Sequence, residues 1–351
     1  MKNGPITGQV ISPALLSTSD QQTWRQLLAP RPAAFLSFAY ARAVASCVPL
    51  VRICRIEQGG RTVAFFPFQY RSRAHAAAGI GERLGGELSD YFGLVAAPDF
   101  HIEAQTLLRL SGLRSLFFTH LEQDDYGHRL SGCKPEVGHR IDFPQGGGAF
   151  WEEKGRTDKK FVSDTERRER KLIREYGPLS FVYSSVDAVK SLDTLISQKR
   201  AQYRRTQVGD ALGAEKTRAL LVTLCRTNDP QCSGIVSTLH AGETWVASHF
   251  GLRSGSTLHY WFPVYNPALK AFAPGRLLLK QIIQSSPLHG LARIDRGAGD
   301  SVAKRDFSTS QHFFSTGLWQ RPGIGALTHR VWLAIDWRMT RYFGRRVADM
   351  E

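Results

Sequence analysis

Cysteine is scarce in this chain and forms no recognisable pattern. The 351 residues include five cysteines, an odd number, with no Cys-x-x-Cys pair and no histidine at metal-ligand spacing. A disulfide framework and a cysteine-based metal site are therefore not expected, and we expect reduced, mostly buried thiols. They are Cys47, Cys54, Cys133, Cys225 and Cys232. This usage favours a cytoplasmic protein without a metal cofactor.

Long hydrophobic runs are also absent. No segment approaches the ~20 consecutive apolar residues that are needed to span a bilayer. The N-terminal stretch MKNGPITGQVISP has one lysine and no apolar run of signal-peptide length. The sequence therefore predicts a cytoplasmic protein that, if it meets a membrane, does so peripherally from the surface.

Acidic residues are too few to balance the basic ones. The chain has 46 Lys+Arg against 31 Asp+Glu. Residues 1–150 carry only 15 basic and 12 acidic residues. The excess of positive charge thus lies in the C-terminal part, where it favours an anionic partner such as a nucleotide cofactor, an acidic glycan or an anionic membrane. Nucleic acid is less favoured, because the basic helix expected over 158–176 lacks interleaved aromatic side chains for base stacking.

The length predicts two domains, since single cores usually stop growing below 351 residues. The triple glycine that ends at Gly148 is the best boundary, so we divide the chain at residues 1–148 and 149–320. In the first part, two β-rich runs around Gln58-Gly59-Gly60 predict a hairpin, and in the second the runs IVSTLH, TWVASHFGLR and TLHYWFPVY predict an antiparallel meander. Residues 321–351 form a third segment, expected as a basic amphipathic helix. That helix would lie on an anionic membrane or dock back onto the protein.

The segment from Trp245 to Phe307 is the most informative. It predicts two apolar strands, the turn AFAPGRLLLKQI opening a helix, and a short strand ending in IDRGAGDSVAKRDF. Such an order places backbone amides at a helix N-terminus directly after a strand, which suits a phosphate-bearing ligand. The sequence therefore indicates an enzyme that uses a phosphorylated cofactor.

The same residues resemble a known family. The run SHFGLRSGSTLHYWFPVYNPALKAFAPGRLLLKQII, followed by IDRGAGDSVAKRDF, resembles the C-terminal domain of the CelD/BcsL-like acetyltransferases associated with bacterial cellulose and exopolysaccharide biosynthesis. Those proteins, like the FemAB aminoacyltransferases, look like two GNAT-type domains in tandem. The resemblance implies an α+β fold whose domains are mixed, mostly antiparallel sheets flanked by helices. It is weaker over the first 145 residues, where we expect a degenerate domain.

The resemblance also implies a function. It suggests an acyltransferase that moves an acetyl or other acyl group from acyl-CoA to an amine or hydroxyl, on a sugar or lipid-linked glycan precursor. Two other functions stay open at this point. One is FemAB-like transfer from aminoacyl-tRNA, and the other is a non-catalytic scaffold at the membrane or in a polysaccharide-export complex.

The donor site implied by the resemblance is the start of the helix in AFAPGRLLLKQI. Gly275, Arg276, Leu277 and Leu278 would present amides to the pyrophosphate of coenzyme A, with Arg276 adding charge-assisted bonds. The usual GNAT signature has a second small residue, and this turn keeps only one glycine. The alternative is that Pro274 merely begins an amphipathic helix whose leucines face the core.

The most specific match is the pattern Asp-x-Gly-x-Gly-Asp-x-x-x-Lys. Asp295 ends a strand beside the cofactor helix and is placed to orient or deprotonate an acceptor. Asp300 is expected to be the N-cap of the next helix. Lys304 would either pair with Asp300 or reach the phosphates of the cofactor, and we count it among the cofactor-binding residues.

Further candidate residues lie on neighbouring elements. Tyr265 ends a strand, where its phenol would protonate the departing thiolate or simply pack beside aromatic neighbours. His249 and His259 lie on adjacent strands as possible bases. Tyr203 and Arg204, at the basic end of a long helix, are candidates for acceptor binding, although a solvated helix terminus also explains them.

Overall fold

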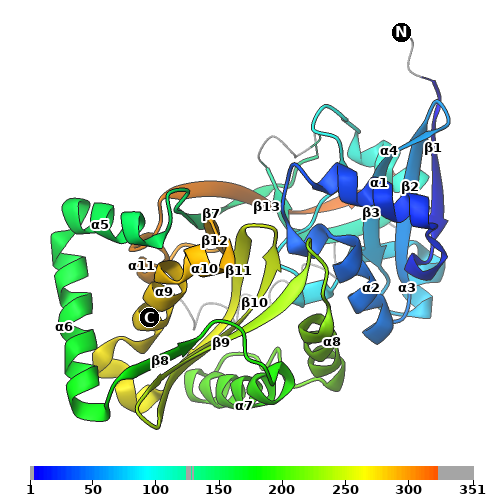
Figure 1. The fold of residues 1–351 in the computed structure, drawn as a ribbon. Helices are drawn as coiled ribbons and strands as arrows, with labels where there is room; N and C mark the ends of the chain where they lie inside the picture. Colours follow the sequence, from blue (N-terminus) through cyan, green and yellow to red (C-terminus); the bar gives the residue numbers. More distant parts are fainter. Residues whose placement is uncertain (1–3, 124–127, 129, 323–351) are drawn as a thin grey trace. The chain divides into compact units, whose positions relative to one another are not determined.

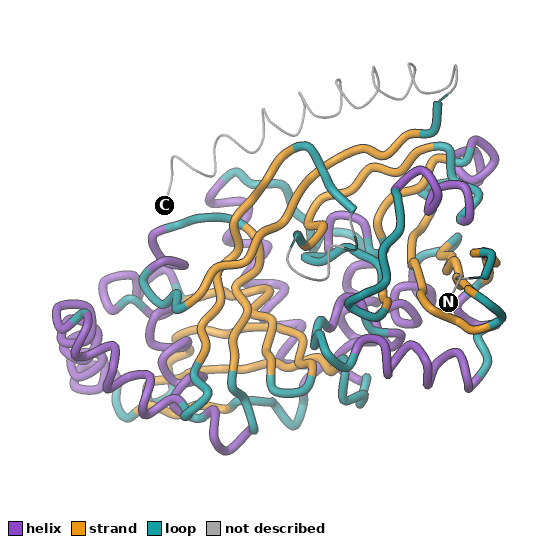
Figure 2. The backbone as a smooth tube through the Cα atoms, turned by 90° about the horizontal axis from the view of Figure 1, so that it is seen from above, coloured by secondary structure: helices purple, strands orange, loops and turns teal. Residues whose placement is uncertain are grey.

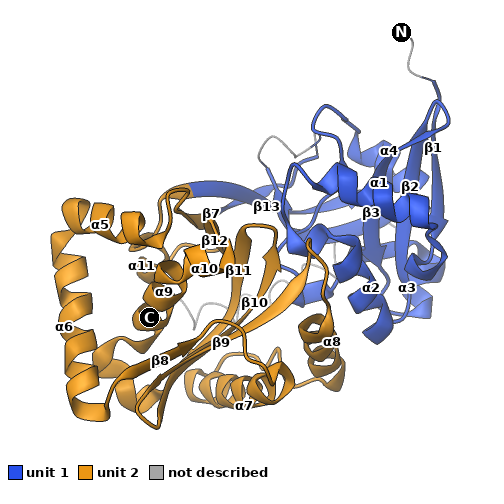
Figure 3. Cartoon of the chain, viewed as in Figure 1, with its two compact units in different colours: residues 1–138, 311–351 blue, residues 139–310 orange. Residues whose placement is uncertain are grey.

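The computed structural model describes residues 4–123, 128 and 130–322, which form two compact units (Figure 1, Figure 3). Unit 1 comprises residues 1–138 and 311–351, and unit 2 comprises residues 139–310. The backbone of both can be followed in Figure 2, where strands are orange and helices purple. The predicted tail helix lies outside the described residues from residue 323 onward.

Unit 1 is a mixed sheet flanked by helices, with the strand order β1-β2-β3-β4-β6-β13 and β5 beside β3. Its strands are β1 (Ile6–Ile11), β2 (Val51–Gln58), β3 (Arg61–Gln69), β4 (Ile80–Arg83), β5 (Val95–Ala96), β6 (Ser115–Glu122) and most of β13 (Ser310–Gln320). Its helices are α1 (Thr18–Leu28), α2 (Phe38–Cys47), α3 (Arg73–Ala78) and α4 (Ala104–Leu110), with single 3-10 turns at Pro13–Leu15, Ala34–Leu36 and Gly86–Leu88. The predicted hairpin is confirmed: β2 and β3 meet at Gly59 and Gly60, whose φ angles of 58° and 75° suit the tight turn.

Unit 2 is a second mixed sheet, with the order β7-β12-β11-β10-β9-β8. Its strands are the end of β7 (Lys134–Asp142), β8 (Leu179–Val182), β9 (Ser233–Ala241), β10 (Thr244–Ser254), β11 (Thr257–Tyr265) and β12 (Arg293–Ala298). Its helices are α5 (Gly147–Thr157), α6 (Lys159–Tyr176), α7 (Ala188–Thr206), α8 (Glu215–Arg226), α9 (Pro274–Gln284), α10 (Ser286–His289) and α11 (Val302–Arg305), and a 3-10 turn covers Pro267–Phe272. Strands β9, β10 and β11 form the predicted antiparallel meander.

The two units repeat one topology. In each, an edge strand is followed by two helices, then by three antiparallel strands, and then by a helix that leads to a strand parallel to the third. Strand β4 pairs in parallel with β6, as β11 does with β12. The predicted α+β class of mixed sheets flanked by helices is therefore confirmed.

The last strand of each sheet comes from the other half of the sequence. β13, which follows β12 in the chain, pairs antiparallel with β6 in unit 1. β7, which follows β6 in the chain, lies next to β12 in unit 2. The units therefore differ from the sequence-based division at 148 and 320, because propensities and glycine runs do not report which sheet a strand will join.

The triple glycine begins a helix, with Gly146 as the N-cap of α5 and Gly147 and Gly148 in its first turn. Gly147 is the first residue of α5, and a Cβ placed on it would lie 1.7 Å from the carbonyl oxygen of Ile283 in α9. Its amide donates to Ser286 Oγ over 3.1 Å. A glycine is needed here for close approach of two backbones, which a sequence cannot distinguish from flexibility.

Candidate functional site

Strands β11 and β12 pair for only three residues and then separate. The parallel register joins Thr257, Leu258 and His259 of β11 to residues 293–295 of β12. Beyond His259, β11 stays paired with β10 as far as Tyr265. The free edge of the last part of β11 therefore faces the side from which β12 has departed, and Pro263, whose carbonyl accepts from Lys199 on this edge, has no N–H.

A histidine and a carboxylate occupy the last paired position. Asp295 and His259 are register partners, with Asp295 Oδ1 3.6 Å from His259 Nδ1, and both residues are buried. The amide of Gly297 donates to Asp295 Oδ1 over 2.7 Å, and Arg140 Nε of β7 lies 3.6 Å from Oδ2. The carboxylate is thus fixed between two basic groups and a backbone donor. This arrangement suits a carboxylate that orients an imidazole for proton transfer.

Helix α9 begins shortly after the end of β11. Its N-cap, Ala273, has a left-handed backbone with φ 52°, and its carbonyl accepts from the amides of Arg276 and Leu277 over 3.0 and 3.1 Å. Gly275 has open space in the direction of a Cβ, with no atom within 4 Å. The side chains of Leu277 and Leu278 are fully buried. Of the predicted donor residues, the structure therefore leaves Gly275 accessible, whereas the leucines anchor the helix.

Arginines gather around one carboxylate beside the first turn of α9. Asp164 of α6 accepts hydrogen bonds from Arg167 over 2.6 Å, from Arg168 over 2.7 Å and from Arg276 over 3.1 Å. Hydrogen bonds from Arg168 and Arg167 lower the pKa of Asp164 to about 2. A second guanidinium nitrogen of Arg168 donates to the carbonyl of Ala271, just before α9. Three positive charges around one negative charge leave this helix start positive, which favours an anion.

His249 does not fit the role of a base. Its ring is fully buried and stacks on Tyr260 with a centroid separation of 4.2 Å. Burial lowers the pKa of His249 to about 3, with the charge of His259 as a further cause. A group this weakly basic and this enclosed is poorly suited to accept a proton at neutral pH. Of the two histidines considered, the structure brings His259 to Asp295.

Tyr265 lies at the end of β11, and Tyr203 lies on α7. Tyr265 ends β11 opposite Ala247 and packs partly buried against the core of unit 2. Tyr203 lies on α7, with the ammonium of Lys199 5.4 Å from its ring centroid. Lys199 Nζ also donates to the carbonyl of Pro263 over 2.7 Å, so this helix contacts the part of β11 that has separated from β12. Arg204 is exposed near the end of the same helix.

The residues that follow β12 stabilise one another. Ser301, and not Asp300, is the N-cap of α11, because its hydroxyl accepts from the amide of Lys304. Asp300 instead contacts His139 Nε2 at 3.0 Å and Arg305 at 2.7 Å. The ammonium of Lys304 donates to the carbonyl of Ala298, where it holds the turn. The predicted N-cap is therefore wrong, and Lys304 donates to the backbone of the turn that precedes α11.

Several residues that build this site carry no local signal in the sequence. Arg140, His139 and Asp164 come from β7 and α6, far along the chain from the residues that they contact. Lys280 of α9 is buried and pairs with Glu169 of α6 at 2.5 Å. Only the packing of these elements shows the role of each residue.

The equivalent place in unit 1 is filled by an arginine. Strands β4 and β6 pair in parallel over three residues, ending at Glu82, and the next residue of β4 is the buried Arg83. Its Nη1 donates to the carbonyl of Ser89 over 2.5 Å and lies 2.6 Å from His120 Nδ1. Arg83 and His120 thus contact each other just beyond the point where the parallel pairing of β4 and β6 ends.

The topology and the separated strands define a GNAT-like fold, and the comparisons with known proteins agree. Residues 159–305, fewer than half of the chain, match the family model described as acetyltransferase (GNAT) domain. This segment runs from α6 to α11 and contains the separated strands and α9. It is therefore similar to acetyltransferase domains of the GNAT type. No curated protein matches the chain.

Solved structures share the fold over most of the chain. FemX has a TM-score of 0.59 at 7% identity and covers 92% of this chain and 99% of its own. A conserved protein of unknown function from Bacteroides thetaiotaomicron has a TM-score of 0.53 at 11% identity, covering 86% and 98%. The C-terminal domain of a putative lysylphosphatidylglycerol synthetase from Agrobacterium fabrum has a TM-score of 0.51 at 12% identity, covering 90% and 96%. At these identities the likeness establishes the fold alone.

Within the described part of the chain, the helices include none that is both long enough and apolar enough to cross a membrane.

Proposed function

We propose that unit 2 is an acyltransferase that moves an acetyl or other acyl group from acyl-CoA to an amine or hydroxyl acceptor. The observation that carries this proposal is the pair His259–Asp295 at the position where β11 and β12 separate. Helix α9 follows β11 in the chain, with open space at Gly275 and arginines beside its first turn. A held donor, an exposed strand amide and a base are the requirements for direct acyl transfer.

Each residue would have one role. The first turn of α9, with Arg276 and Arg168 beside it, would bind the pyrophosphate of the donor through charge and backbone dipoles. An amide of the unpaired side of β11 would donate to the thioester carbonyl as negative charge develops there. His259 would accept the proton of the attacking amine or hydroxyl, while Asp295 holds the ring in position. The C–S bond of the thioester then breaks, and coenzyme A would leave as a thiolate that takes up the proton held by His259 or one from water.

Donor binding is tested by calorimetric titration with acetyl-CoA. We expect micromolar binding to the wild type and loss of binding in Gly275→Trp, because the indole would occupy the open space at the helix start. Gly148→Trp is the matched control, since Gly148 lies in the first turn of α5 with no atom within 4 Å of its Cβ position. A wild-type protein that is folded but does not bind acetyl-CoA would contradict the acetyl-CoA form of the proposal.

The base is tested by turnover. With an acceptor in hand, release of free thiol should fall by about 10²-fold or more in His259→Gln and in Asp295→Asn, while acetyl-CoA binding stays near the wild-type value. His249→Gln should leave the pH dependence of turnover unchanged, because His249 is enclosed in the core. Full turnover in the His259 variant would remove this residue from the mechanism.

We further propose that the acceptor is a sugar or a lipid-linked glycan precursor met at an anionic membrane surface. Support comes from the resemblance of the segment 245–307 to the CelD/BcsL-like proteins and from the positive charge of the C-terminal part. A screen of amino sugars, glycans and lipid-linked oligosaccharides with radiolabelled acetyl-CoA tests this proposal. Transfer to none of them, beside transfer to an unrelated amine, would contradict the acceptor class.

A further inference from the structure

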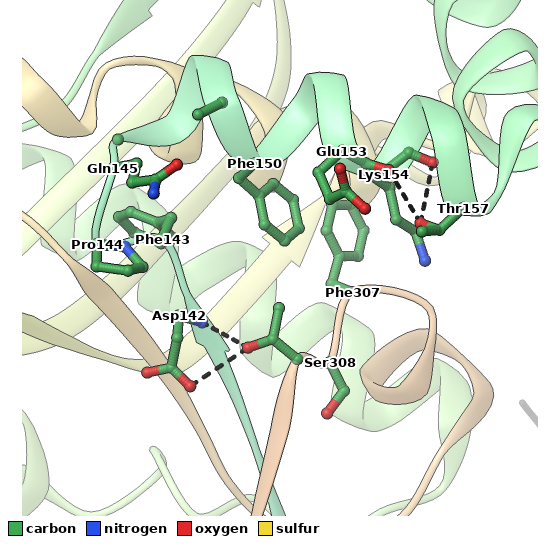
Figure 4. Close-up of a pocket in the computed structure, with 13 residues that line it drawn as sticks. Asp142, Phe143, Pro144, Gln145, Phe150, Glu153, Lys154, Thr157, Phe307 and Ser308 are labelled. Carbon is green, nitrogen blue, oxygen red and sulfur yellow. Dashed lines mark hydrogen bonds between the residues drawn. The ribbon is translucent and has the colours of Figure 1, made fainter.

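Unit 2 contains a cavity of about 310 Å³ between α5 and residues 307–309, which precede β13 (Figure 4). Three phenylalanine rings, those of Phe143, Phe150 and Phe307, form its apolar wall. Thr157 and Lys154 of α5 lie at one end (Figure 4). A volume of this size is at the lower end of the range for small-molecule sites and suits a nucleoside rather than a whole coenzyme.

One face of α5 lines the cavity. Its residues at positions 150, 153, 154 and 157 recur at intervals of three and four, which places them on one side of a helix. The beginning of the helix is held against α9 by the close approach at Gly147. The wall is therefore fixed by packing on the helix that we propose for donor binding.

A single aromatic ring joins this cavity to the start of α9. The ring of Phe161 carries the guanidinium of Arg276 at 4.4 Å and the ammonium of Lys154 at 5.1 Å. Phe307 meets the same ring edge to face, with centroids 5.1 Å apart. Lys154 and Phe307 belong to the cavity wall, whereas Arg276 belongs to the first turn of α9. The cavity and the first turn of α9 are thus separated by about the thickness of one aromatic ring, a span that one extended nucleotide can bridge.

We propose that the cavity binds the adenosine end of the acyl-CoA donor, an inference that rests on the proposed function. The adenine ring packs against the phenylalanine wall, since stacking on aromatic side chains stabilises any purine. Lys154, which pairs with Asp158 at 3.4 Å, shares the Phe161 ring with Arg276 of α9 and would meet the phosphates there. Glu153, which also lines the cavity, is paired with Arg156 at 3.1 Å. The pyrophosphate at α9 and the adenosine in the cavity then belong to one ligand.

The test fills the cavity and compares two donors. Ala149 lines the cavity, so Ala149→Trp should occupy it and weaken acetyl-CoA binding by about tenfold or more, the usual effect of losing a stacked base. S-acetyl-4′-phosphopantetheine lacks adenosine and should bind the wild type and this variant equally. Glu152→Trp, on the exposed side of the same helix, is the control and should bind acetyl-CoA normally. Phe150→Leu keeps an apolar wall and should give a smaller loss, which serves if the tryptophan variant fails to fold.

The outcomes separate the inference from the proposed function. Acetyl-CoA binding by the wild type that is unchanged in folded Ala149→Trp and Phe150→Leu would overturn the adenosine site and leave the donor at α9. Equal weakening of both donors by Ala149→Trp would also overturn it, because the effect would not depend on adenosine. The adenosine site would also be overturned if the wild type bound acetyl-CoA no more tightly than S-acetyl-4′-phosphopantetheine. Absence of binding by either donor would overturn the proposed function itself.

Discussion

The buried pair Lys280–Glu169 should be the strongest single electrostatic link between α6 and the proposed donor helix α9. Lys280 Nζ lies 2.5 Å from Glu169 Oε2, with side-chain exposures of 6% and 16%, and Gln281 Nε2 donates to the other carboxylate oxygen over 3.1 Å. Removing one partner of such a pair leaves an uncompensated charge, which costs roughly 3–5 kcal/mol when burial is complete. Because Glu169 keeps some solvent and the amide of Gln281, we expect about 3 kcal/mol for Lys280→Met.

The assay is urea unfolding followed by intrinsic fluorescence, with thermal melts beside it. A loss of about 3 kcal/mol corresponds to a fall in melting temperature of roughly 6–12 °C for a unit of this size. The double variant Lys280→Met with Glu169→Leu should recover most of the loss, since an apolar pair of similar volume is often neutral or better. Lys171→Met is the control: Lys171 pairs with Glu175 at 3.7 Å in solvent, and its loss should cost less than about 1 kcal/mol. Equal effects of the two lysine variants, or a double variant no more stable than Lys280→Met, would refute the reasoning.

Three further outcomes are expected. Gly147→Ala should destabilise unit 2 by about 3 kcal/mol or more in urea unfolding, because backbone must move, whereas Gly148→Ala, with open space, should be neutral within about 0.5 kcal/mol. The folded pKa of His249, about 3, lies below its unfolded value, so the unfolded state binds the extra proton and stability falls as pH drops below about 6.5. Between pH 6.5 and 5.5, His249→Phe should reduce the loss of unfolding free energy by about 1 kcal/mol. An unchanged pH dependence of the unfolding free energy would contradict this role of His249. In a thiol-reagent titration at pH 8, exposed Cys133 should react before Cys54 and Cys225, because burial raises the pKa of these two thiols to about 11 and about 12.

Local patterns in the sequence predicted much of the fold. The helix over 158–176, the hairpin at Gly59 and the antiparallel meander all appear where expected. Each depends on interactions between residues close in sequence, such as hydrophobic periodicity, turn glycines and helix stops. The exchange of β7 and β13 between the two sheets had no such signal, because strand order depends on contacts between distant segments.

The candidate site shows the same limit. Asp295 and the helix start at Gly275 were predicted from a run of neighbouring residues, and the structure places Asp295 at the last paired position of β11 and β12 and Gly275 in the first turn of α9. The choice between His249 and His259 was not available, since both occupy strands of similar pattern. The bulge that shifts the register of β10 and β11 between Phe250 and Leu252 lies between the His249 and His259 pairings, and such shifts cannot be read from composition.

The sequence by itself determined the α+β class, the uneven charge and the run of residues around α9 that carries the candidate chemistry. Only the tertiary structure decided which side chains contact that run. It places His259 beside Asp295, pairs Arg276 with Asp164, and forms the phenylalanine wall of the cavity. The physical reason is the range of the forces involved. Helix and turn propensities act between near neighbours, whereas burial and ion pairing join residues that only packing brings within a few ångströms.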